Sequence, residues 1–276
     1  MTDNPVDSSV RNTEVKSGYA PVNGLKMYYE IHGSGEPLVL LHGGVGGIEM
    51  FGPNLAALSA TRKVIGVNLQ AHGHTADIDR PLRFELMGDD VAALVKYLGI
   101  EKADVMGYSL GGGAALQMAI RHPGVVRKLV VISAPIKRAG FYPEVLADFD
   151  RMGPDAGVNM KYSPLSQIYP EANWAVLFTK LGDLLRRDYD WTKDVAAIKS
   201  PIMIVAADAD AVRTAHTVEF FSLLGGGRGD AGLDGSRRPA ARLAIIPGMT
   251  HYDILSTPTV AALVTPFLEA PQTKEG

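Results

Sequence analysis

Residues 107–111, with the sequence GYSLG, have the types and spacing of a turn that presents a nucleophilic serine. Ser109 is flanked by a glycine two positions away on each side. The backbone of such a turn is strained, and side chains at those two positions would collide, so glycine is favoured at both. The pattern therefore predicts a nucleophile at Ser109, provided that the neighbouring segments form the elements that the turn must join.

The segments on either side of Ser109 have the patterns of a strand and a helix. Residues 102–106 (KADVM) predict a short buried strand. Residues 110–122 are rich in Ala, Leu, Met and Ile, and they predict a helix that ends at His122 because a proline follows. The order of strand, glycine-flanked serine and helix is the one that a nucleophilic turn requires.

A serine hydroxyl needs a base to take its proton, and the chain has seven histidines. In folds with this serine turn, the base follows the serine in the sequence, which leaves His216 and His251 at a useful distance. His251 follows a predicted strand, 241–246, and ligands of open α/β sheets bind at the carboxyl ends of the strands. His216 lies inside an amphipathic helical segment and is expected to be partly exposed. We therefore predict that His251 is the base.

The base needs a carboxylate to orient its ring and to stabilise the imidazolium. The predicted strand 202–206 is followed at once by two candidates, Asp208 and Asp210. Both lie at the carboxyl end of a strand that precedes His251, so position alone admits either one. The aspartate that does not orient the histidine is expected to cap the loop through its own backbone.

The negative charge that develops on a substrate oxygen needs preorganised hydrogen-bond donors. One donor in this kind of site is the backbone N–H of the residue after the nucleophile, here Leu110. The other comes from the loop after an earlier strand, and the glycine-rich segment 42–44 assigns it to the N–H of Gly44. His42 is expected to orient this loop rather than to act as a base.

The elements that must position these residues alternate along the chain. Apolar runs predict strands, and an Asn-Gly pair between the first two predicts a hairpin. Strands are expected at 18–22, 25–31, 37–41, 63–69, 126–132, 202–206 and 241–246, in addition to 102–106. Further helices are expected at 51–60, 84–98, 194–198, 215–224 and 259–268. This alternation predicts an α/β fold with a mostly parallel sheet and helices on both faces.

Composition limits the classes of partner. The 276-residue chain has a net charge of −3 and no cysteine, so it lacks the basic field of a nucleic-acid binder and forms no disulfide. No run is long enough to span a membrane, and the polar residues 1–9 lack the apolar core of a signal peptide, so a cytoplasmic enzyme is expected. The histidines show no ligand-like clustering, and no metal is expected. The sequence is compatible with a monomer or a homodimer.

Five motifs together resemble the serine α/β-hydrolase superfamily, which includes esterases and lipases. They are LHGG at 41–44, NLQAHGHT at 68–75, GYSLGG at 107–112, AADAD at 206–210 and PGMTH at 247–251. The resemblance implies a sheet of eight mostly parallel strands, a helical cap, and a cofactor-free Ser–Asp–His triad. On this matching Ser109, Asp210 and His251 take the three roles.

The expected organisation has three parts. Residues 1–17 form a loose N-terminal segment, residues 18–134 and 193–276 form the α/β-hydrolase core, and residues 135–192 form a helical cap. The segment 135–192 lacks a clear strand and holds many aromatic residues. Some of these, with residues near the serine, are expected to line an apolar substrate pocket. The expected lining residues are Met50, Tyr108, Phe141, Tyr142, Trp174, Met249 and Tyr252.

The expected reaction is hydrolysis of a carboxylic ester or lactone through an acyl-enzyme, with a small-molecule ester as substrate and no cofactor. Two other activities use the same scaffold: hydrolysis of carbon–carbon bonds and cofactor-free perhydrolysis. A hydrolase fold that only binds a ligand is the alternative outside catalysis, and such a protein would not need all three residues of a triad.

Overall fold

The computed structural model describes residues 15–271, and every structural statement below refers to them. Of the expected N-terminal segment 1–17, residues 1–14 lie outside this described part. Lys16 and Ser17 belong to the first strand. In the described residues, no helix combines the length and the apolar character needed to cross a bilayer.

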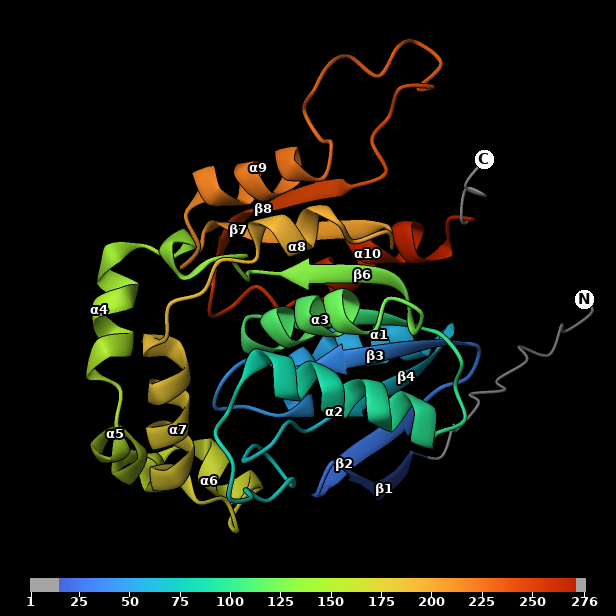
Figure 1. The fold of residues 1–276 in the computed structure, drawn as a ribbon. Coiled ribbons are helices and arrows are strands. Elements are labelled where there is room, and N and C mark those ends of the chain that lie inside the picture. Colours follow the sequence, from blue (N-terminus) through green and yellow to red (C-terminus); the bar gives the residue numbers. More distant parts are fainter. Residues whose placement is uncertain (1–14, 272–276) are drawn as a thin grey trace, which may run out of the picture.

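The core of the molecule is one eight-stranded sheet with the order β1-β2-β4-β3-β5-β6-β7-β8 (Figure 1). The antiparallel pairs are β1 with β2 and β2 with β4, and the remaining neighbours are parallel. The strands are β1 (Lys16–Val22), β2 (Leu25–His32), β3 (Glu36–Leu41), β4 (Arg62–Val67), β5 (Ala103–Tyr108), β6 (Val126–Ile132), β7 (Ile202–Ala209) and β8 (Arg242–Thr250). The α/β-hydrolase fold and its mostly parallel sheet are thus confirmed.

Helices cover both faces of this sheet, because strand side chains alternate between the faces. On β3, Val39 and Leu41 pack into the cluster that includes side chains of α2, α3, α8 and α9. Leu38 and Leu40 pack into the opposite cluster, together with Leu58 of α1 and side chains of α10. These helices are α1 (Pro53–Ser59), α2 (Phe84–Tyr97), α3 (Leu110–Arg121), α8 (Thr192–Ala196), α9 (Thr214–Leu223) and α10 (Thr259–Glu269).

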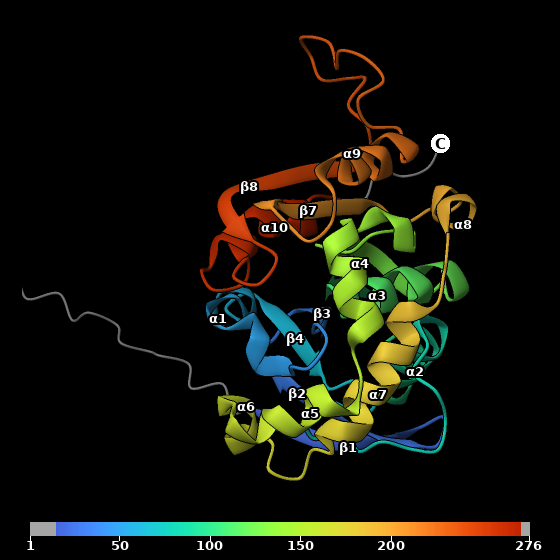
Figure 2. The ribbon, with the colours of Figure 1, turned by 90° about the vertical axis from the view of Figure 1, so that its left-hand side faces the viewer.

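The segment between β6 and β7 is helical. It contains η2 (Arg138–Gly140), α4 (Pro143–Arg151), α5 (Pro154–Val158), η3 (Asn159–Tyr162), α6 (Pro164–Ile168) and α7 (Trp174–Arg186), followed by α8 of the core. Figures 1 and 2 show α4–α7 grouped on one side of the molecule, the side toward which the arrowhead of β6 points. The chain therefore places this helical group beside the carboxyl ends of the parallel strands.

One expected helix is divided. The segment 51–60 was expected to be a single helix, but a 3₁₀ turn, η1 (Ile48–Phe51), is separated from α1 by Gly52. Gly52 has a φ of 46°, which breaks the helical geometry, and Pro53 then starts the new helix. The break therefore separates the 3₁₀ turn from α1.

Candidate active site

Ser109 lies in the tight connection between β5 and α3. Its φ is 52°, in the left-handed region that non-glycine residues rarely adopt. A Cβ added at Gly107 would lie 2.1 Å from the carbonyl oxygen of Gly111, and one added at Gly111 would lie 2.2 Å from that of Leu41. The two glycines are therefore required by close backbone contacts, in agreement with the collision expected from the sequence.

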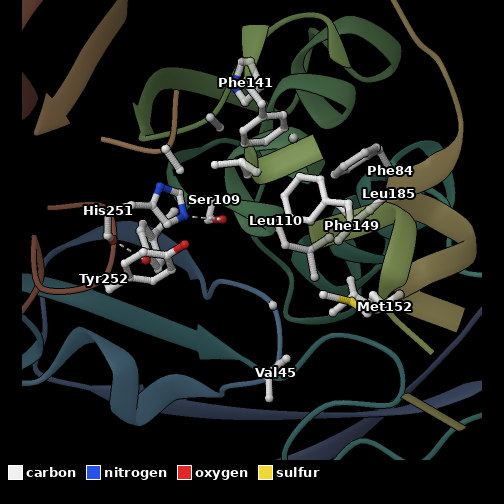
Figure 3. Close-up of a pocket in the computed structure, with 18 of the residues that line it drawn as sticks. Val45, Phe84, Ser109, Leu110, Phe141, Phe149, Met152, Leu185, His251 and Tyr252 are labelled. Atoms are coloured by element: carbon white, nitrogen blue, oxygen red, sulfur yellow. Dashed lines mark hydrogen bonds between the residues drawn. The ribbon is translucent and has the colours of Figure 1, made fainter. Parts of the chain in front are cut away.

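Ser109 and two side chains from distant parts of the chain form one hydrogen-bonded series, and Figure 3 shows its bond between Ser109 and His251. The Oγ of Ser109 lies 3.0 Å from Nε2 of His251, and Nδ1 of the same ring lies 2.8 Å from Oδ1 of Asp210. A neutral imidazole with its proton on Nδ1 donates to the carboxylate and leaves Nε2 free to accept from the serine. This arrangement is able to take a proton from Ser109.

The carboxylate of Asp210 accepts four hydrogen bonds. Besides the His251 ring, its donors are the N–H of Val212 at 3.1 Å, the N–H of Ala207 at 3.0 Å and the hydroxyl of Ser133. Burial alone would raise the pKa of Asp210. The hydrogen bond and charge of His251, with the bonds from Ser133 and Ala207, more than offset that effect and hold the pKa below its usual value. The group is thus kept ionised to stabilise an imidazolium.

Asp208, the other candidate aspartate, does not contact the His251 ring. Both of its carboxylate oxygens lie 3.0 Å from the backbone N–H of Gly248, and its side chain is exposed. Asp208 lies near the end of β7 and binds Gly248 of β8, so it joins the two strands. The expectation that it caps the loop through its own backbone was therefore wrong, because β7 extends past it to Ala209. Of the two aspartates left open by position, only Asp210 is in contact with the histidine ring.

The sequence analysis missed Ser133. This residue follows the last residue of β6, has a φ of 50° and is buried. Its hydroxyl donates to Asp210, and its N–H donates to the carbonyl of Val205 at 2.9 Å. The available signal was its position, because a serine that directly follows an apolar strand of a parallel sheet lies at the edge where ligands bind.

The loop that contains Gly44 is held by a buried histidine. His42 Nδ1 donates to the carbonyl of Gly43 at 2.7 Å, and its Nε2 accepts from the N–H of Leu69 at 3.1 Å. Burial, with a smaller contribution from the neighbouring His72, lowers the pKa of His42 to about 3, so the ring stays neutral. The backbone carbonyl of His42 accepts a hydrogen bond from the N–H of Gly111 at 3.0 Å, which ties the loop to the serine turn. His42 therefore orients the loop, as expected.

Gly44 and Leu110 both line the cavity beside Ser109. Within the described part of the chain, neither backbone N–H donates to another residue. Leu110 is the first residue of α3, where helix geometry leaves the N–H groups without intrahelical partners. Val45, next to Gly44, has a φ of 70°, which is strained for a β-branched residue. The geometry leaves both N–H groups available to an anionic oxygen.

The cavity beside Ser109 has a volume of about 240 Å³ and a mainly apolar lining (Figure 3). The segment between β6 and β7 contributes nearly half of the lining: Ala134, Pro135, Phe141, Val145, Phe149, Met152, Leu181, Leu185 and Tyr189. The core contributes Val45, Met50, Phe84, Tyr108, Leu110 and Tyr252, among others. In Figure 3, Phe149, Phe84 and Leu185 lie on the side of Ser109 away from His251. A substrate group can therefore extend between the strands and the helical segment.

The model of the alpha/beta hydrolase fold family matches residues 36–261 of this sequence. The chain belongs to the alpha/beta hydrolase family. This assignment confirms the resemblance that the five sequence motifs carry.

Proteins similar to this hydrolase are named for different activities. A protein called "Putative carbamate hydrolase RutD" from Azorhizobium caulinodans is 28% identical over 217 residues, which cover 70% of this chain and 81% of that protein. The protein of the same name from Caulobacter sp. (strain K31) is 32% identical over 222 residues, which cover 68% and 79% of the two chains. Carboxylesterase CesB (YbfK) from Bacillus subtilis has a TM-score of 0.72 at 20% identity, over 94% of this chain and 93% of that one. The likeness to CesB shows a shared fold.

Three of the expected lining residues of this hydrolase lie away from the cavity. Met50, Tyr108, Phe141 and Tyr252 line it, whereas Tyr142, Trp174 and Met249 do not. Tyr142 precedes α4 and is exposed, Trp174 packs on the core from the start of α7, and Met249 packs on the core cluster beside α10. Aromatic content alone did not distinguish the residues that line the cavity from those that pack on the core or are exposed.

The expectation for His216 was also wrong. His216 was expected to be partly exposed, but it is only 2% exposed. Its Nε2 accepts from the N–H of Ile136 at 3.2 Å, and a Cβ at Gly140 would lie 2.4 Å from its ring. The ring of His216 is therefore buried against the segment that follows β6, where it holds the backbone.

Proposed function

We propose that this hydrolase cleaves carboxylic esters that carry an apolar group, through an acyl-enzyme on Ser109. The observation that carries the proposal is the 3.0 Å separation of Ser109 Oγ and His251 Nε2 beside an apolar cavity. This distance lies within the range in which a base takes a proton from a nucleophile. Lactones are cyclic esters and present the same carbonyl.

In the proposed reaction, His251 takes the proton of Ser109 as Oγ attacks the ester carbonyl. The bond between the carbonyl carbon and the alcohol oxygen then breaks, and the leaving alcohol receives the proton from His251. Water attacks the acyl-enzyme in the second half of the reaction and gives its proton to the same ring. The acid leaves when Oγ of Ser109 recovers a proton, so the enzyme returns to its starting state.

Asp210, Gly44 and Leu110 act on the charges that appear during these steps. The low pKa of Asp210 keeps a negative charge beside Nδ1, where it stabilises the imidazolium. The N–H groups of Gly44 and Leu110 are assigned to the oxygen of the tetrahedral intermediate. Losing one such donor costs about 2.7–4 kcal/mol of transition-state stabilisation.

The lining of the cavity favours a neutral, apolar substrate group. No Asp, Glu, Lys or Arg belongs to the lining within residues 15–271, and burying an uncompensated charge there would be costly. A volume of about 240 Å³ corresponds to about eight water-sized volumes, so the group is a medium acyl chain or a single aryl ring. The relatives named as carbamate hydrolases suggest a second carbonyl substrate, but an anionic carbamate would find no cation in this lining.

In this proposal, residues 135–192 act as the cap of the active site. Phe141, Phe149 and Leu185 from this segment line the cavity. They would exclude water from the reacting carbonyl and select the substrate group by shape. The residues of the strands and their loops would carry the chemistry.

The proposal is tested with p-nitrophenyl butyrate and a fluorophosphonate probe. The wild type should hydrolyse the ester and be labelled at one serine. Ser109→Ala should lower kcat by on the order of 10⁶-fold and abolish labelling, because it removes the nucleophile. Ser222→Ala, on the exposed side of α9, is the matched control and should change neither result.

Two results would contradict the proposal. Near-full turnover by folded Ser109→Ala would show that another group attacks the carbonyl. Labelling of Ser109 without turnover of any short or medium ester would show a reactive serine with a different substrate, and N-substituted carbamates would be assayed next.

A further inference from the structure

Tyr108 links the serine turn to the main chain of the histidine loop. It is the last residue of β5 and precedes Ser109, and it is 5% exposed. Its hydroxyl donates a hydrogen bond of 2.6 Å to the backbone carbonyl of His251. The two residues are 143 positions apart in the sequence, so this bond joins the end of β5 to the segment that follows β8 at the carboxyl edge of the sheet.

The ring of Tyr108 has two further contacts at the site. A Cβ added at Gly43 would lie 2.7 Å from Cε1 of the ring, so the ring lies directly on the loop that presents Gly44. Its centroid lies 5.4 Å from that of the His251 ring. One buried side chain thus contacts the loop of the oxyanion donor and both ends of the His251 residue.

The bond to the His251 carbonyl differs from the other bonds of that loop. Thr250, the last residue of β8, is bonded to Asp253 three positions away, and Gly248 of β8 is bonded to exposed Asp208. The bonds of the His251 ring to Asp210 and Ser109 fix the ring, and the bond to Ser109 has to change as the proton moves. The Tyr108 hydroxyl instead holds the backbone on which the ring is mounted, and that bond can persist throughout the reaction.

The phenol is suited to this constant role. Burial, with the nearby charge of Asp210, raises the pKa of Tyr108 above its ordinary value. The hydroxyl therefore remains a neutral donor over the whole range in which a histidine base works. The carbonyl of His251 would lose its partner if the hydroxyl were removed, which frees the backbone to shift.

We propose that Tyr108 is a positioning residue, which holds the backbone of His251 so that Nε2 stays within reach of Ser109 Oγ. The inference rests on the proposed ester hydrolysis. Displacing a reacting group by about 1 Å can cost about a hundredfold in rate, so a single backbone tether can have a large effect on kcat. Substrate binding depends on the ring and the apolar lining, and these are independent of the hydroxyl.

The test compares Tyr108→Phe with Tyr169→Phe. Both substitutions remove a hydroxyl from a tyrosine that is 5% exposed, and Tyr169 donates to Glu49 but does not line the cavity. Tyr108→Phe should lower kcat about ten- to a hundredfold with KM unchanged. The rate of labelling by the fluorophosphonate should fall by the same factor. Tyr169→Phe should lower the melting temperature and leave kcat and the labelling rate unchanged.

Each other outcome overturns the inference. A lower melting temperature for Tyr108→Phe with a normal kcat per folded molecule would assign the hydroxyl to stability alone. A raised KM with a normal labelling rate would make Tyr108 a wall of the cavity. Equal losses of kcat in both variants would show a general response to a missing buried hydroxyl. Failure of the proposed function is distinguishable, because the wild type itself would then neither turn over esters nor be labelled.

Discussion

The two ends of the parallel strands bury polar side chains in different ways. At the amino ends, the carboxylate of Asp104 is 0% exposed and bonded to two guanidinium groups. Arg62 lies 2.7 Å from it, and Arg127 binds it through two nitrogens at 2.8 and 2.9 Å. All three residues lie at or near the first residue of β4, β5 or β6. Opposite charges there stabilise each other.

At the carboxyl ends, buried polar groups are joined in series and the backbone is strained. Asp210 is bonded to His251 and His251 to Ser109. Of the five non-glycine residues with positive φ in the described part of the chain, Val45, Ser109 and Ser133 lie at this edge. Each such residue costs on the order of 1–3 kcal/mol, which the rest of the fold must offset.

The difference distinguishes an edge of paired charges from the edge at which we propose that catalysis takes place. The Asp104 carboxylate is buried and bonded to two guanidinium groups of the protein. At the other edge, Ser109 Oγ and the N–H groups of Gly44 and Leu110 remain available beside a cavity. Substitutions at the carboxyl edge should therefore lower activity, and substitutions at the amino edge should lower stability.

The largest expected effect is at the carboxyl edge. Asp210→Asn should lower kcat on the order of 10⁴-fold, because an amide neither holds the correct tautomer of His251 nor stabilises the imidazolium. Asp208→Asn, two positions earlier near the end of β7, is the matched control. Its amide oxygen can still accept from Gly248, so only a small loss is expected. The measurement is kcat for p-nitrophenyl butyrate with each folded variant.

The variants Asp210→Asn and Asp208→Asn test directly whether contact with the His251 ring distinguishes the two aspartates. If Asp208→Asn loses as much activity as Asp210→Asn, the contact with the ring is not what distinguishes the two carboxylates. The chemistry would then depend on the whole loop after β7.

The second expected effect is at the amino edge. Asp104→Ala leaves the buried guanidinium of Arg62 without its carboxylate and removes one carboxylate from half-buried Arg127, which also pairs with Glu36, so the free energy of unfolding should fall by about 3–5 kcal/mol. The value of kcat per folded molecule should stay near that of the wild type. Asp183→Ala removes an exposed ion pair with Arg186 on α7 and should cost about 0–1 kcal/mol. Urea unfolding and ester assays on the same samples measure both quantities.

A fall in kcat for Asp104→Ala without a fall in stability would show that the two edges are coupled. The strand β5 would be the direct route for such coupling, because Asp104 is near its start and Ser109 follows its end.

The sequence predicted the sheet and the main residues of the candidate site for identifiable reasons. Strands buried on both faces are continuous apolar runs, such as 37–41, and this pattern identified most of them. The serine turn was visible because the backbone contacts of Gly107 and Gly111 leave no room for side chains. His251 was identifiable because the carboxyl end of a late strand is where such folds place a base.

The rest depended on geometry that residue types do not encode. Asp208 and Asp210 are two positions apart in the sequence. The pairing of β7 with β8 shifts its register between Ala207 and Ala209, at the position of Asp208. Residue types alone do not reveal such a shift. The lining of the cavity could not be separated from the core, because Phe84 and Trp174 are both apolar residues at the start of a helix. Only the packing of α2 and α7 places the first at the cavity and the second away from it.

The smallest expected effect separates strain from hydrogen bonding at Ser133. Both Ser133→Ala and Ser133→Gly remove the donor to Asp210, so each should lower kcat by about tenfold. The two variants differ in backbone freedom, because Ser133 has a φ of 50° and glycine adopts that conformation without steric cost. Ser133→Gly should therefore be more stable than Ser133→Ala by about 1 kcal/mol, measured by urea unfolding. Equal kcat with unequal stability would show that the strain at this edge only holds the donor in place. Recovery of kcat in the glycine variant would instead show that the hydroxyl of Ser133 is not what supports Asp210.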